Sequence, residues 1–143
     1  MATTNAATTY LEHALINHIF KGTAFTSPGN NIYVGLATAV SDAEAGSVTE
    51  ANFGAYQRQQ VAAADWTVPS DASTDAQTAT NTNNIEFPAS TGTTETITHV
   101  IITDNANRAT GNILFVGALD SSRQIASGDI FRINATNLTI ELK

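Results

Sequence analysis

The sequence predicts a mainly β fold, an antiparallel β-sandwich or jelly-roll-like domain with one N-terminal α-helix. A length of 143 residues suits a single domain spanning residues 1–143. One stretch near the N-terminus has helical periodicity, and after it short apolar segments alternate with turn-forming residues. About seven short strands at this spacing are typical of a sandwich or barrel, whereas strands alternating with helices would indicate a parallel sheet.

The helix is expected at about residues 9–21. Its main face has a 3.6-residue period and comprises Leu11, Ala14, Leu15, His18 and Ile19. Thr9 and the glutamate three residues later have capping-box spacing, and Gly22 can end the helix in the left-handed conformation. Ile16 and Phe20 widen the apolar face, as expected for a helix that lies across a sheet or is pressed between two subunits.

The remaining elements are predicted from period-two alternation and turn residues. Strands are expected at about residues 32–37, 56–61, 94–103, 112–119, 130–133 and 138–142. Residues 41–52 are polar and acidic and predict a loop, and residues 104–111 predict a turn. Residues 70–84 contain no large apolar side chain, so we expect a polar low-complexity loop there that adds nothing to a core.

Composition excludes several classes of function. Thirteen Asp and Glu residues against six Lys and Arg residues give a net charge of −7. This acidic balance argues against nucleic acid and anionic membranes as partners, because both require a basic surface. The absence of cysteine excludes disulfides and thiolate metal sites. No run of about 18 apolar residues predicts a membrane span, and no cofactor motif is present.

The histidines predict packing roles and no chemistry. His13 and His18 are five residues apart, so they lack the i, i+4 spacing of a helical zinc pair. His99 lies in a predicted strand, with no G-x-S-x-G element to supply a nucleophile. We therefore expect no catalytic residue, no metal site and no enzyme activity.

The acidic residues also predict no site. Residues 104–108 begin like a calcium loop, but Ala106 and Arg108 occupy positions where oxygen ligands are needed. Asp42, Glu44 and Glu50 could bind a hard cation loosely, although a solvated acidic loop is the default interpretation.

The order of short segments along the chain carries a family resemblance. The segments are Tyr10-Leu11-Glu12, residues 21–28, residues 32–36, residues 56–59, residues 87–92, Ile97-Thr98-His99, Gly117-Ala118-Leu119 and residues 125–129. In this order they resemble a family of small tailed-bacteriophage virion proteins, often labelled tail fibre proteins and similar to head-decorating cement proteins. The resemblance runs from about residue 10 to residue 140 and implies a structural role without an active site.

What the resemblance implies most directly is a capsid cement or decoration protein on the outer surface of the head. Its partners would be the major capsid protein, whose lattice it stabilises, and copies of itself as a homo-dimer or homo-trimer. A tail or tail-fibre component is the alternative within the virion. A carbohydrate-binding β-sandwich for host attachment, with exposed rings around Tyr56 and Trp66, and a hydrolase that uses His99 are alternatives from other classes.

Interface anchors are expected among aromatic and large apolar residues, because such side chains dominate the energy of protein interfaces. The candidates are Tyr10, Leu15, Ile19, Phe20, Phe25, Tyr56 and Trp66, with Tyr33 and Phe53 as further aromatic candidates. The alternative for each is a place in the core of the monomer.

Overall fold

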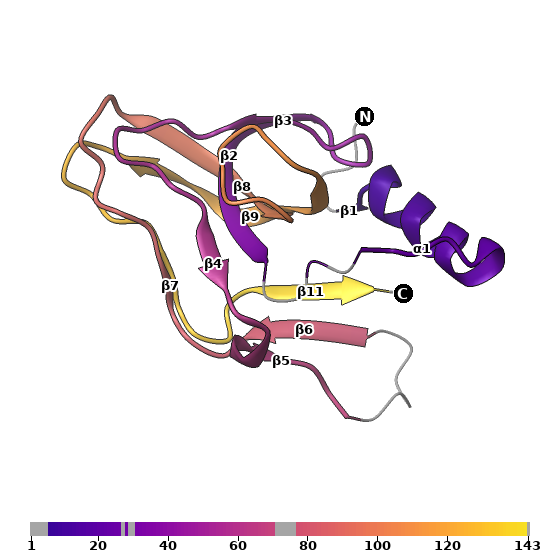
Figure 1. Cartoon of the computed structure of the whole chain (residues 1–143). Coiled ribbons are helices and arrows are strands. Elements are labelled where there is room, and N and C mark those ends of the chain that lie inside the picture. The colour runs from indigo at the N-terminus through magenta and orange to yellow at the C-terminus, as the bar shows by residue number, and fades with distance from the viewer. Residues whose placement is uncertain (1–5, 27, 29–30, 71–76, 143) are drawn as a thin grey trace.

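The computed structural model describes residues 6–26, 28, 31–70 and 77–142. It confirms a mainly β, sandwich-like fold with one α-helix (Figure 1). In chain order the elements are β1 (Ala6–Ala7), α1 (Thr9–Lys21), β2 (Ile32–Asp42), β3 (Ser47–Glu50), β4 (Gln59–Val61), the short 3-10 helix η1 (Ala63–Asp65), β5 (Trp66–Thr67), β6 (Gln77–Asn81), β7 (Ile85–Glu86), β8 (Glu95–Thr103), β9 (Ile113–Ile125), β10 (Arg132–Ile133) and β11 (Thr139–Leu142).

A six-stranded antiparallel sheet forms the larger layer. Its order is β1-β9-β8-β2-β3, and β4 also pairs with β2. In the middle of the sheet Val100 of β8 lies opposite Leu36 of β2 on one side and Gly117 of β9 on the other. The period of two places Leu36 and Val100 in the main core, while Ile101 and Val116 form a second apolar cluster with Ala37.

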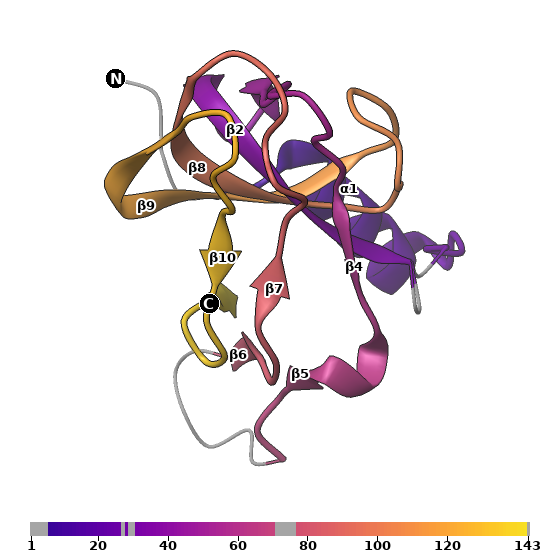
Figure 2. The ribbon, with the colours of Figure 1, turned by 90° about the vertical axis from the view of Figure 1, so that its left-hand side faces the viewer.

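The main core lies between strands β2 and β8 of this sheet and the segments that contain β4, β7 and β10. Figure 2 shows these three strands leading from the larger sheet towards the smaller three-stranded sheet, β11-β6-β5. Phe87 is at the centre, stacked with Tyr56 at a centroid distance of 6.1 Å and edge-on to Phe131 at 5.9 Å. The buried members are Val34, Leu36, Ala51, Phe53, Val61, Ile85, Phe87, Ile97, Val100, Ile102, Ile125, Phe131 and Ile133.

The predicted loop over residues 41–52 is wrong at residues 41–42 and 47–50, where strands form. Strand β2 continues to Asp42, and β3 pairs with it through Val48 opposite Val40 and Glu50 opposite Ala37. Strand β3 pairs only with β2 among the described strands, and its burial alternates, with Val48 half-buried and Glu50 buried. The sequence shows no apolar alternation because one of the two inward positions carries a glutamate. The predicted strand over residues 56–61 is shorter than expected, because pairing with β2 is confined to Gln59–Val61.

The predicted loop over residues 70–84 is wrong where β6 forms, and residues 71–76 lie outside the described part of the chain. Strand β6 pairs with β5 on one side and β11 on the other. Its last residue, Asn81, is 1% exposed. The side-chain amide of Asn81 donates to the carbonyls of Asn83 and Asn134, and its oxygen accepts from the N–H of Leu138. A polar residue enters the interior here because its hydrogen bonds are satisfied.

Helix α1 is attached to the larger sheet at its N-terminal end. Thr8, and not Thr9, is the N-cap: its hydroxyl oxygen accepts a hydrogen bond from the N–H of Leu11 and its hydroxyl donates to the carbonyl of Ile113 in β9. Leu11 is the buried residue of α1. The helix ends at Lys21, and Gly22 has the predicted left-handed conformation, with φ of 64°.

A buried ion pair joins Glu50, at the end of β3, to Arg58. Nε and Nη2 of Arg58 donate to the two carboxylate oxygens at 2.7 and 2.8 Å, and the two side chains are only 1% and 5% exposed. The hydroxyl of Tyr56 donates to Glu50 Oε1 at 2.8 Å and accepts from the N–H of Leu36 at 2.9 Å. The carboxylate therefore connects β3 with β2 and with the segment before β4.

The same ion pair holds the loop between β8 and β9. Nη1 of Arg58 donates to the carbonyls of Asn105 and Thr110 at 2.7 and 2.9 Å. Ala109 donates its N–H to Glu50 Oε2 at 2.8 Å. Ala109 has φ of 57°, a left-handed conformation that costs about 1–2 kcal/mol for an L-residue. The hydrogen bond to Glu50 helps to offset that cost.

A second arginine and a glycine complete the loop. Nε and Nη2 of Arg108 donate to the carbonyls of Ala51 and Glu50 at 2.7 and 2.9 Å. Gly111 has φ of 72°, and a Cβ at that position would lie 2.3 Å from Cβ of Asn105, so only glycine fits. The predicted turn over residues 104–111 is thus a loop that is hydrogen-bonded to the end of β3 through both Arg108 and Ala109.

The charge state of Glu50 follows from these contacts. Burial alone raises the pKa of a carboxyl group, but the hydrogen bonds from Arg58, the N–H of Ala109 and the hydroxyl of Tyr56 outweigh it. The pKa of Glu50 therefore lies below its ordinary value of 4.5. Burial also raises the pKa of the Tyr56 phenol, so its hydroxyl stays protonated and donates.

The cap of α1 can be tested with Thr8→Ala. This change removes the N-cap oxygen and the hydrogen bond to Ile113, so we expect a loss of about 1–2 kcal/mol in the free energy of unfolding. Urea denaturation measures the loss, and far-UV circular dichroism should show less helix. Thr8→Ser keeps the hydroxyl and should retain most of the stability; equal losses in both variants would contradict this role of Thr8.

The ion pair can be tested with Glu50→Gln, which keeps the shape of the side chain and removes its charge. Arg58 is then left buried without a counter-charge, and we expect the free energy of unfolding to fall by about 3–5 kcal/mol in urea denaturation. The matched control is Glu86→Gln, which breaks the exposed pair with Arg132, whose side chains are 47% and 51% exposed. The control should lose less than about 1 kcal/mol, and similar losses in the two variants would contradict the importance of burial.

The lowered pKa of Glu50 predicts acid destabilisation. The contribution of Glu50 is fully present above the ordinary pKa of 4.5 and is lost as the pH falls through the lower pKa of the folded state. Urea denaturation between about pH 6 and pH 3 should therefore show a smaller decline in stability for Glu50→Gln than for the unmodified chain. An identical decline in the two proteins would show that Glu50 does not titrate with a lowered pKa.

Candidate assembly surface

The last two turns of α1 expose three large apolar side chains. The exposed fractions are 56% for Ile16, 67% for Ile19 and 74% for Phe20. Their i, i+3, i+4 spacing places them side by side on one face of the helix, and we call these three residues the α1 stripe. Figure 1 shows α1 projecting beyond the end of the larger sheet. Residues 23–26 lie beside the helix on the flank of Tyr10 and Asn17.

The predicted helix face is covered only in part. Leu11 is buried and Leu15 is half-buried, whereas Ile19 and His18 are exposed. The reason is that α1 meets the body at its first turn, where Thr8 is held by β9. Of the two alternatives for the wide apolar face, packing of Ile19 on the sheet is therefore wrong, and packing against a neighbouring subunit stays a prediction.

Tyr10 stands between two hollows beside α1. The smaller, of about 230 Å³, lies between α1 and residues 23–26 and is lined by Tyr10, Asn17 and Phe25 among others. Tyr10 is 45% exposed and Phe25 is half-buried. Both rings therefore remain within reach of a partner, although they lie on a different flank of the helix from the α1 stripe.

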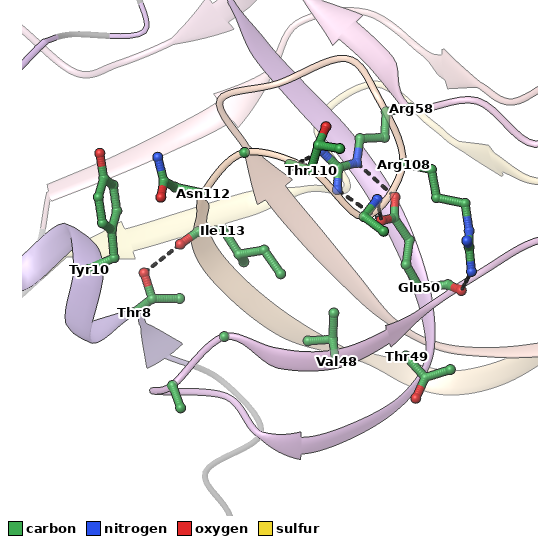
Figure 3. Close-up of a pocket in the computed structure, with 14 residues that line it drawn as sticks. Thr8, Tyr10, Val48, Thr49, Glu50, Arg58, Arg108, Thr110, Asn112 and Ile113 are labelled. Carbon is green, nitrogen blue, oxygen red and sulfur yellow. Dashed lines mark hydrogen bonds and ion pairs between the residues drawn. The ribbon is translucent and has the colours of Figure 1, made fainter.

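The larger hollow, of about 570 Å³, opens between α1, β3 and the loop before β9 (Figure 3). Tyr10 and Asn112 line one end, and Glu50 and Arg58 line the other. Each oxygen of the Glu50 carboxylate already accepts two hydrogen bonds, from Arg58 and Tyr56 or from Arg58 and the N–H of Ala109. A carboxylate with all its acceptor sites engaged is poorly placed to act as a base.

Tyr56 and Trp66 lie against the main core. The Tyr56 ring stacks on Phe87 and meets Phe53 edge-on at a centroid distance of 5.2 Å. Trp66 is half-buried against the same cluster, and its indole Nε1 is buried without a hydrogen-bond partner in the described part of the chain. The structure thus places Tyr10, Leu15, Ile19 and Phe20 on α1, and of these Ile19 and Phe20 belong to the α1 stripe. It places Tyr56 and Trp66 in the body, along with Tyr33 in β2 and the buried Phe53.

The histidines and acidic residues do not converge. His99 Nδ1 lies 2.7 Å from the hydroxyl of Thr98, its Nε2 is buried without a partner among described residues, and burial lowers its pKa. His18 Nδ1 lies 3.2 Å from the carbonyl of Thr23. Over residues 6–26, 28, 31–70 and 77–142, no three His, Asp or Glu side chains gather as metal ligands would, and no helix there is long and apolar enough to cross a membrane.

The structure reveals features that the sequence left unassigned. Glu50 was grouped with a solvated acidic loop, yet it is buried and paired with Arg58. The sequence held one sign of this contact. Tyr56 and Arg58 are two positions apart in a predicted strand, so both point to the same side, where Glu50 lies in the folded chain. Ile16 completes the α1 stripe, and its signal was its position beside the predicted apolar face.

Two comparisons with known proteins bear on identity. The family model described as Podophage GP4 fiber I protein gp80 matches residues 6–141. A search of curated proteins finds no match. The match covers α1 and all the strands, except for the last residue of β11. The α1 stripe therefore lies within the matched region. The chain therefore belongs to the Podophage GP4 fiber I protein gp80 family, and it is a structural protein of the bacteriophage virion.

Proposed function

We propose that this chain is a non-enzymatic fibre subunit of the virion, held in its assembly by contacts that cover the α1 stripe. The observation that carries the proposal is the exposure of Ile16, Ile19 and Phe20 on a helix that projects from the body. The largest exposed apolar patch on a soluble protein typically measures a few hundred Å² and is often an interaction site. The family description, which names a fibre protein, supports the fibre as the place of that assembly.

The length of α1 supports the same conclusion. The helix has 13 residues, and isolated helices of about 12–15 residues are marginal in water. Most of the stability of such a helix comes from packing of its apolar face, and α1 buries only Leu11 fully in its own body. A partner that covers the α1 stripe would add the packing that the monomer does not supply.

A structural role without bond-making chemistry agrees with the state of the polar groups. The larger of the two hollows contains one buried carboxylate, Glu50, and its oxygens accept hydrogen bonds from Arg58, Tyr56 and Ala109. The carbohydrate-binding alternative required exposed rings around Tyr56 and Trp66, and both rings pack against the core. Neither observation favours catalysis or sugar stacking as the main role.

The fibre role and the cement role differ in where the chain binds in the particle. A cement protein would bind the major capsid protein on the outer head surface, whereas a fibre subunit binds other fibre or tail proteins and copies of itself. The family description favours the fibre, so we propose the fibre. The two positions require similar surfaces and are distinguished by where the chain is found.

Localisation in purified particles tests the proposal. Antibody-gold labelling or a cryo-EM map with this chain traced should place it in the fibres or at their attachment to the tail. Density on the head lattice would instead support the cement role, and absence from the particle would overturn both.

Phe20→Asp should reduce incorporation into particles at least about tenfold, as expected for an interface anchor. Val68→Asp, at an exposed apolar residue far from α1 in sequence and 59% exposed, should be incorporated normally.

A further inference from the structure

We propose that the α1 stripe is covered by the α1 stripe of a second copy of this chain, so that two helices pack together across a twofold axis. Each partner in such a pair contributes the same patch, which makes the contact self-complementary. The inference deepens the proposed function, because it names the partner that covers the assembly surface. It rests on that function only for the premise that the α1 stripe is an assembly surface.

The shape of the stripe fits a helix. Ile16, Ile19 and Phe20 form a ridge with i, i+3, i+4 spacing, and helix pairs pack by placing such ridges into the grooves of the facing helix. A sheet would present a flat, pleated surface with a period of two instead. Among the described residues α1 is the one α-helix, so a second copy of the chain supplies a helical ridge of matching spacing and length.

The area of the stripe matches a substantial part of a stable contact. A fully buried aromatic side chain removes about 150–250 Å² from water, so the three partly exposed side chains together offer on the order of 400 Å². A standard interface buries about 800 Å² on each partner. The stripe thus supplies roughly half of that area as its apolar centre. Thr9, Glu12 and His13, which continue the same face towards the N-terminus and are exposed, are available as the polar rim.

Charge favours this face for contact between identical copies. The chain has a net charge of −7, so two copies repel each other over most of their surface. Within α1 one negative residue, Glu12, is balanced by one positive residue, Lys21. The three residues of the stripe carry no charge. Because α1 projects from the body in Figure 1, two helices can meet while the acidic bodies remain apart.

Sedimentation equilibrium of the purified full chain tests the pairing. Between about 1 and 100 µM the chain should change from its monomer mass of 15.0 kDa towards twice that value. Phe20→Asp and Ile19→Asp should each weaken the association at least about tenfold, since both place a charge at the centre of the contact. Val68→Asp and Ile130→Asp are matched controls, because these residues are 59% and 50% exposed and lie outside α1.

A cross-linking experiment reports which face is used. The chain has no cysteine, so Ile16→Cys introduces a single thiol in the stripe. A short bis-maleimide reagent should join two copies of Ile16→Cys efficiently and two copies of Ile130→Cys poorly. Circular dichroism of each variant confirms that the fold is kept.

The outcomes separate the pairing from the proposed function. A chain that stays monomeric over the whole range, or a dimer that Phe20→Asp leaves intact, overturns the pairing. If such a chain is nevertheless found in fibres, the fibre role stands and another virion protein covers the stripe. A dimer that depends on Phe20 in a chain absent from particles would support the pairing and overturn the fibre role.

Discussion

The buried ion pair between Glu50 and Arg58 is the constraint on which the arrangement of the larger sheet depends. Two buried charges are costly, and the cost is offset here because both carboxylate oxygens and the three guanidinium nitrogens have hydrogen-bond partners. Those partners come from β3, β8, the loop before β9 and the segment before β4. One charged pair thus joins residues up to 59 positions apart in sequence. It holds a loop whose path apolar packing alone would not specify.

The position of α1 follows from that constraint. The loop held by Arg58 and Arg108 leads directly into β9, and the first residue of β9, Ile113, accepts the hydrogen bond from Thr8 that fixes the start of the helix. Leu11 then anchors the first turn, and the rest of the helix extends past the sheet. The exposed stripe is therefore a consequence of how the helix is attached: a firm hold at one end leaves the other end available for a partner.

Much of this fold could be predicted from local patterns, and the exceptions have physical causes. The bounds of α1, the stop at Gly22 and the strand ending at Thr103 follow from periodicity and turn chemistry, which act over a few residues. Strand β3 could not be predicted because one of its two inward positions is Glu50, a charged residue that hides the alternation. The burial of Glu50 and of Asn81 was missed because it depends on hydrogen-bond partners that only the folded chain brings near. For the candidate surface, periodicity identified Ile19 and Phe20 but not how far along α1 the sheet would reach.

The bidentate geometry of Glu50 and Arg58 also restricts how this family can diverge. Losing either member leaves a buried charge, whereas replacing both by apolar residues of similar volume is often neutral in other proteins. Here the joint replacement carries an added cost, because the carbonyls of Asn105 and Thr110 would lose their donor. A single substitution at either position should therefore lower the free energy of unfolding strongly. Replacing both residues together should lower it less, but should not restore it fully. We expect the two positions to evolve as a unit, and Lys to be a poor substitute for Arg58, because an ammonium group lacks the planar fork.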